Sequence, residues 1–222
     1  MMNTMGGMRL FRPTVVFFVL FAPLAMLSQT MLKTASLSCW EGTSSFQTRK
    51  AKTPTIRSNH GFAYGEVTAE ATVQPDQSRS CSNTVRLYYS SNGKNYRMVY
   101  ENHRKLEGIG LVIFGWSNSE KQLLFQTREW QYDSDAEVVK TVLVFDNTTG
   151  EVRELHVGEA LSGVLGSNCE FDEAVVGWQT DHSIVVRVST TPPTSHDEQM
   201  PCVKKSARYV FDVRENTISQ AR

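Results

Sequence analysis

The hydrophobic positions of this chain follow the pattern of β-strands from residue 61 onward. Short runs rich in valine, tyrosine, phenylalanine and threonine alternate in part with polar positions, and clusters of asparagine, aspartate, serine and glycine separate them. A period of two places one face of each strand on a core and is typical of antiparallel sheets. The sequence therefore predicts an all-β, antiparallel fold. The expected strands are 62–73, 84–90, 96–101, 109–116, 122–128, 138–145, 151–157, 174–179, 183–189 and 207–213.

Two connections between these strands carry a distinct signal. Asn92-Gly93 lies between two β-rich runs and predicts a hairpin, because both residues tolerate a positive φ. Residues 158–165 have some helical spacing of apolar positions, but the stretch holds three glycines if Gly166 is counted. We therefore expect a loop there.

An internal repeat runs through the strand pattern. Phe-Gly-Trp-Ser at 114–117, followed by Leu-Leu-Phe at 123–125, matches Val-Gly-Trp-Gln at 176–179, followed by Val-Val at 185–186. The offset is 178 − 116 = 62 residues, and the pattern indicates the same offset for both strands. The two repeated tryptophans are predicted to occupy equivalent buried positions on successive sheets.

The repeat extends to a third copy. Downstream, residues 142–146 match 209–212, and residues 85–89 with Gly93 resemble the last hairpin of a degenerate first copy. Arrays usually have periods of 20 to 50 residues, and variable excursions between the hairpins lengthen the period here. Three units are expected, at about 61–104, 109–157 and 171–220.

Two hairpins resemble those of TolB-like and WD-like β-propeller proteins. Residues 116–125 are similar to the W-S-P-D-G-K-x-L-x-F hairpin of TolB-like blades, with Asn-Ser in place of Pro-Asp and Glu120 in place of glycine. Residues 144–152 resemble the D-x-x-T-G turn that ends those blades. The resemblance implies about three propeller-blade-like repeats in an open or partial propeller, because closure takes four or more blades. A β-sandwich is the alternative. Members of the family are mostly binding scaffolds or accessory domains, and no catalytic residue carries over.

The N-terminus has the pattern of a signal peptide over residues 1–30. Arg9 and Arg12 form a basic region, and residues 15–27 follow without a polar side chain. This apolar run is shorter than the roughly 20 residues that a membrane-spanning helix needs. We therefore expect an exported protein, secreted or periplasmic, with an uncleaved anchor as the alternative.

Residues 31–60 are interpreted as a linker, followed by a β-repeat domain at 61–222. From residue 33 the segment is rich in lysine, threonine, serine and arginine, and it has only four sizeable apolar side chains. Leu-Ser-Cys at 37–39 loosely resembles the end of a bacterial lipobox, which leaves a lipid on Cys39 open. Contact with a membrane is expected only through an uncleaved signal or such a lipid.

Four cysteines suit disulfides in an exported chain. Three pairings are possible, and free buried thiols are the alternative. Cys169 and Cys202 fall inside one proposed repeat unit, which favours that pair, and Cys39–Cys81 follows by elimination. The spacing of cysteines and histidines does not indicate zinc.

The composition favours a binding module over an enzyme. The chain has 23 basic and 23 acidic residues without a basic stripe, so nucleic acid is not an expected partner. It lacks a GxSxG or HExxH motif, and no cofactor or metal is expected. Trp130 and Tyr132 lie in a polar excursion and are the candidate contacts for a protein or glycan partner outside the cytoplasm, unless they cap the core. The alternative function is a carboxylate-dependent hydrolase, or an enzyme-accessory or inhibitor domain.

Overall fold

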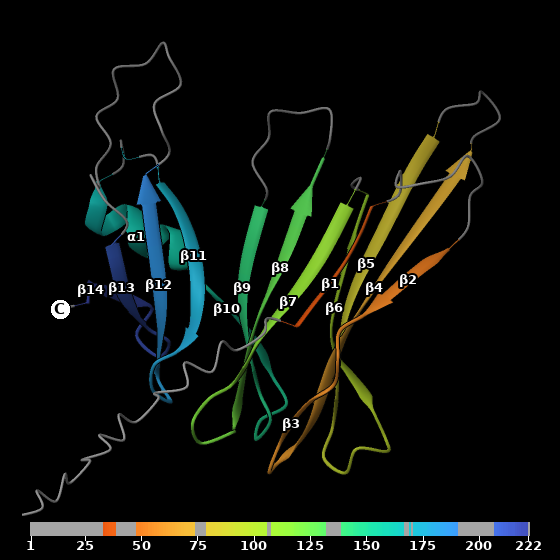
Figure 1. The fold of residues 1–222 in the computed structure, drawn as a ribbon, viewed down its shortest axis with the longest axis horizontal. Coiled ribbons are helices and arrows are strands. Elements are labelled where there is room, and N and C mark those ends of the chain that lie inside the picture. The colour runs from red at the N-terminus through yellow and green to blue at the C-terminus, as the bar shows by residue number, and fades with distance from the viewer. Residues whose placement is uncertain are drawn as a thin grey trace, which may run out of the picture. The chain divides into compact units, whose positions relative to one another are not determined.

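The computed structural model describes residues 33–38, 48–73, 79–105, 108–131, 139–166, 169, 171–190 and 207–221. Every described residue belongs to one compact unit within residues 31–222. The described residues are mostly strands in three antiparallel sheets, none of which is closed (Figure 1). The prediction of an all-β, antiparallel fold is confirmed.

The three sheets follow one another along the chain. The first sheet contains β2 (Arg49–Lys52), β3 (Ile56–Ser58), β4 (Gly61–Val73), β5 (Arg79–Ser90) and β6 (Arg97–Arg104). The middle sheet has the order β1 (Lys33–Ser38), β7 (Gly108–Trp116), β8 (Gln122–Trp130), β9 (Val139–Asp146) and β10 (Val152–Leu155). The last sheet has the order β11 (Phe171–Trp178), β12 (Ser183–Thr190), β13 (Ala207–Asp212) and β14 (Thr217–Gln220).

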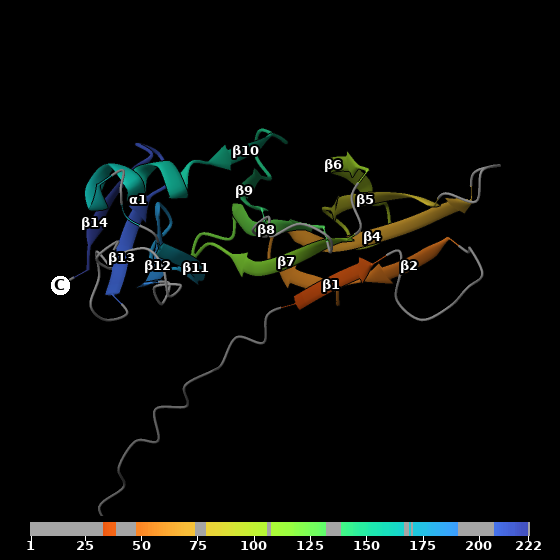
Figure 2. The same cartoon turned by 90° about the horizontal axis from the view of Figure 1, so that it is seen from above.

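Both faces of the middle sheet are buried. Leu111 and Ile113 of β7 belong to a core cluster shared with the first sheet, whereas Val112 and Phe114 belong to a cluster shared with the last sheet. The middle sheet therefore lies between the other two, as Figure 2 shows from above. Burial on both faces explains why β7 is an almost unbroken apolar run instead of an alternating one.

The segment interpreted as a linker contains three strands, so that interpretation was wrong for its described part. β1 pairs with β7 along its whole length, and β2 and β3 both pair with β4. Only Ala35 and Leu37 of β1 reach the core, and two such residues among polar ones produce no recognisable strand signal. The first unit therefore begins near residue 49 and not at 61.

The stretch expected to be a loop is a helix, α1 (Val157–Leu165). Val157 and Leu161, four residues apart, are buried on one side of it in the cluster between the middle and last sheets. Burial of this apolar side outweighs the cost of the glycines, which is about 1 kcal/mol each relative to alanine.

The repeated tryptophans occupy equivalent strand positions. In β7 and in β11 the register shifts just before the tryptophan, at Gly115 and Gly177, whose φ angles of 141° and 146° suit glycine. Both tryptophans are half-buried, less than expected, and each packs against the cluster shared with the preceding sheet. The offset between the second strands is 184 − 123 = 61 residues and not 62, because the last sheet has the shorter turn.

The hairpins β5–β6, β9–β10 and β13–β14 share one turn chemistry. Asn92, Asp146 and Asp212 each accept hydrogen bonds from the backbone N–H groups two and three residues later. The predicted Asn-Gly hairpin is confirmed, with Gly93 at a φ of 73° between β5 and β6. The same short-range solution therefore recurs in all three sheets.

Candidate binding pocket at Trp130

A pocket of about 350 Å³ lies at the C-terminal end of β8. In Figure 1 this is the upper end of that strand. Three neighbouring strands of the middle sheet, β1, β7 and β8, supply its walls. The lining residues are Thr34, Ala35, Ser36, Gly110, Leu111, Val112, Arg128 and Trp130. The pocket opens on the face of the middle sheet from which Val112 packs toward the last sheet.

Glycines of β7 seat the indole of Trp130 on the sheet. Trp130 is the last residue of β8 and lies directly opposite Gly108. A Cβ atom on Gly108 would lie 1.9 Å from Cε2 of the indole, and one on Gly110 would lie 3.5 Å from Cζ3. The ring therefore lies flat against the backbone of β7, and it remains half-exposed.

Arg128 places a cation beside this ring. It lies two residues before Trp130 on β8, so both side chains leave the same face of the strand. Arg128 is exposed, and no carboxylate among the described residues lies within ion-pair distance of it. Its cross-strand neighbour Lys140 is already engaged, with the Asp172 carboxylate and a main-chain carbonyl of β11.

Contacts on the opposite face of β8 fix the strand end that carries Trp130. The buried carboxylate of Glu129 accepts a hydrogen bond of 2.7 Å from the Asn102 amide and pairs with the Arg104 guanidinium at 3.2 Å. Both partners belong to β6 of the first sheet. The pocket is therefore built on a strand end fixed from behind, a rigid base for a binding site.

The carboxyl groups with shifted pKa values lie in turns, away from this pocket. The backbone N–H of Ser119 lowers the pKa of Asp181, and that of Glu215 lowers the pKa of Asp212. Burial alone would raise the pKa of Asp146, but hydrogen bonds led by that of Thr148 lower it below its ordinary value. These carboxyls serve as acceptors that hold turns. The part of the chain that the structure describes has no group of three possible metal ligands.

Of the two predicted site residues, Trp130 and Tyr132, the structure describes only Trp130. Trp130 lies at a strand end and lines a pocket, whereas Tyr132 lies outside the described residues. Sequence reasoning missed the contributions of β1 and of Gly108 and Gly110. Two glycines at alternate positions, followed by an apolar run, were a usable signal, because they leave one strand face bare for a large ring.

The cysteine pairing stays a prediction. Cys39 and Cys202 lie outside the described residues. No free cysteine occurs among the described residues, and no two of their cysteines lie at disulfide distance, so Cys81 and Cys169 are not joined to each other.

No family model, curated protein or solved structure matches this chain. The resemblance to propeller blades therefore rests on the two hairpins alone. Within the described ranges, no helix is long and apolar enough to span a membrane.

Proposed function

We propose that this chain is an exported binding module, secreted or periplasmic, whose three sheets are propeller-like blades and whose ligand site is the Trp130 pocket. The N-terminal pattern of basic and then apolar residues supports export. The face-to-face succession of sheets, each with the same turn chemistry, supports the blade interpretation.

The observation that carries the binding site is the Arg128 guanidinium beside the half-exposed Trp130 indole, with no carboxylate of the described residues within ion-pair distance of Arg128. An indole face binds a flat or weakly polar ring, and a guanidinium beside it binds a carboxylate. The volume of about 350 Å³ is at the lower end for ligand pockets and suits a ring-sized group. We propose an acidic saccharide, with a sugar ring on Trp130 and its carboxylate at Arg128.

The lining favours binding over carboxylate-dependent hydrolysis. Glycoside hydrolysis needs two carboxyl groups about 5–10 Å apart at the reacting bond. Among the described residues, those that line the pocket include no aspartate or glutamate. An accessory or inhibitor role differs from simple binding in the partner and not in the chemistry of this pocket.

Titration with glucuronate, read by tryptophan fluorescence and calorimetry on the full chain, tests the site. We expect glucuronate to bind better than glucose. Loss of a charge-assisted contact costs roughly 1.5–3 kcal/mol, so Arg128→Ala should weaken glucuronate binding about 10- to 100-fold. Arg214→Ala, at an exposed turn, is the control and should bind as the wild type does. Equal binding of glucose and glucuronate, or an unaffected Arg128→Ala variant, would refute the acidic ligand.

A further inference from the structure

The wall of the Trp130 pocket that β1 forms carries two hydroxyl groups. Thr34 and Ser36 both line the pocket and are exposed. They lie two residues apart on β1, so both side chains leave the same face of the strand. The third residue that β1 contributes to the lining is Ala35, so this wall is uncharged. It therefore suits a neutral group that bears hydroxyls, in contrast to the cationic wall at Arg128.

Strand pairing places these hydroxyls across the Trp130 ring from Arg128. Ser36 lies opposite Gly110, and Gly110 lies opposite Arg128, so the three residues form one row across β1, β7 and β8. The indole extends over the middle of this row, because a Cβ atom on Gly110 would lie 3.5 Å from Cζ3 of Trp130. Neighbouring strands are about 4.8 Å apart, which separates β1 from β8 by about 10 Å. A sugar ring stacked on the indole with its carboxylate at Arg128 therefore has its other side toward β1.

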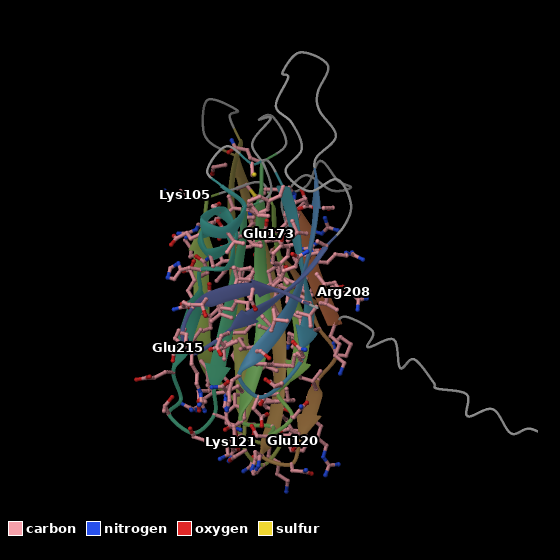
Figure 3. All side chains as sticks on the ribbon, turned by 90° about the vertical axis from the view of Figure 1, so that its left-hand side faces the viewer. Lys105, Glu120, Lys121, Glu173, Arg208 and Glu215 are labelled. Carbon is pink, nitrogen blue, oxygen red and sulfur yellow. The ribbon has the colours of Figure 1, made fainter. Side chains whose placement is uncertain are left out.

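One end of this row meets an ion pair, and the other end lies at the edge of the sheet. Beyond Arg128 the row continues to Lys140. The Lys140 ammonium group lies 2.5 Å from the Asp172 carboxylate and 3.1 Å from the main-chain oxygen of Glu173, both on β11. Figure 3 labels Glu173 toward the upper end of the last sheet, the end of the strands at which the pocket also lies. At the other end, β1 is the edge strand of the middle sheet, and none of the described strands pairs with its outer side. A ligand longer than one ring therefore leaves the pocket over β1.

We propose that the pocket recognises the acidic end of a saccharide chain, with the terminal uronate ring on Trp130 and the neighbouring neutral ring over Thr34 and Ser36. This inference rests on the proposed function and adds the position of the acidic ring in its ligand. The two hydroxyls of β1 donate and accept hydrogen bonds, as sugar hydroxyls do. Arg128 selects the charge of the terminal ring, and the hydroxyls of β1 select a second ring beside it. The ion pair beyond Arg128 opposes a chain that continues in the other direction.

Calorimetric titration of the full chain with three probes tests this assignment. The probes are glucuronate, a disaccharide of glucuronate linked to glucose, and a trisaccharide with glucuronate between two glucose rings. Two neutral hydrogen bonds strengthen binding roughly 5- to 100-fold, so the disaccharide should bind more tightly than glucuronate by that factor. The trisaccharide should bind more weakly than the disaccharide, because its additional ring meets the ion pair of Lys140 with Asp172.

Two double variants of β1 identify the hydroxyls as the cause. Thr34→Ala with Ser36→Ala removes both, and it should bind glucuronate as the wild type does and the disaccharide no better than glucuronate. Thr34→Ser with Ser36→Thr keeps both hydroxyls and should keep the preference for the disaccharide.

Thr217→Ala with Ser219→Ala is the matched control. These two exposed residues also lie two positions apart on an edge strand, β14 of the last sheet, and their loss should leave the preference for the disaccharide unchanged. Equal wild-type affinities for glucuronate and the disaccharide would overturn the inference. A trisaccharide that binds as tightly as the disaccharide, or an alanine variant of β1 that keeps the preference, would also overturn it. A wild type that binds none of the three probes would refute the proposed function itself, and this inference with it.

Discussion

Replacing Gly108 with alanine should displace the Trp130 indole. The added Cβ would lie 1.9 Å from Cε2, 2.1 Å from Nε1 and 2.3 Å from Cζ2 of the ring, far inside van der Waals contact. The ring must therefore leave its seat on β7. Overpacking of this kind costs about 1–3 kcal/mol. In a chain of this size that corresponds to a fall in melting temperature of about 2–10 °C.

Gly110→Ala is the matched control two residues along the same strand. Its Cβ would lie 3.3 Å from Cβ of Ser36 and 3.5 Å from the indole, which a few tenths of an ångström of movement accommodates. We expect Gly108→Ala to lose both stability and glucuronate binding, and Gly110→Ala to keep both close to wild type. Thermal melts followed by near-UV circular dichroism, with titrations on the same samples, measure the two effects. Equal melting temperatures and equal affinities for the two variants would refute the seating of Trp130 on Gly108.

Three further predictions concern stability. Trp178→Phe removes an indole hydrogen bond of 3.0 Å to a main-chain carbonyl of the middle sheet, and it should cost about 0.5–1.5 kcal/mol beyond the loss of ring area. The buried Nε1 of Trp116 has no acceptor among the described residues. In denaturant melts, Trp116→Phe should therefore lower the free energy of unfolding by less than Trp178→Phe does. The folded pKa of Asp146 lies below its unfolded value, so its stabilising contribution is complete above about pH 4 and is lost as the pH falls through the folded pKa. In an acid titration, Asp146→Asn should therefore lose less stability than the wild type does. Non-reducing peptide mapping should find Cys169 joined to Cys202, a loop of 202 − 169 = 33 residues worth about 3–4 kcal/mol in the entropic model, and a Cys39–Cys169 peptide would contradict that pairing.

Much of the fold was predictable because strand alternation and turn chemistry are local. The strands from β4 to β13, the hairpin at Gly93 and the repeated Gly-Trp bulges follow from residues within a few positions of each other. The segment before residue 60 was not predictable in this way. β1 is a strand because β7 offers a partner edge and not because its own six residues prefer that conformation.

Local sequence predicted only part of the candidate site, and strand pairing decided the rest. The sequence alone marked Trp130 as a large ring among charged residues, and it determined an all-β chain with three related units. Only the tertiary structure decided that the ring lies on Gly108 and Gly110, that Arg128 stands beside it with no described carboxylate in ion-pair distance, and that β1 forms the third wall. Local preferences are set by neighbours along the chain, whereas a pocket depends on which strands pair across it. That pairing is set by burial on both faces of the middle sheet, a property that the sheets acquire only together.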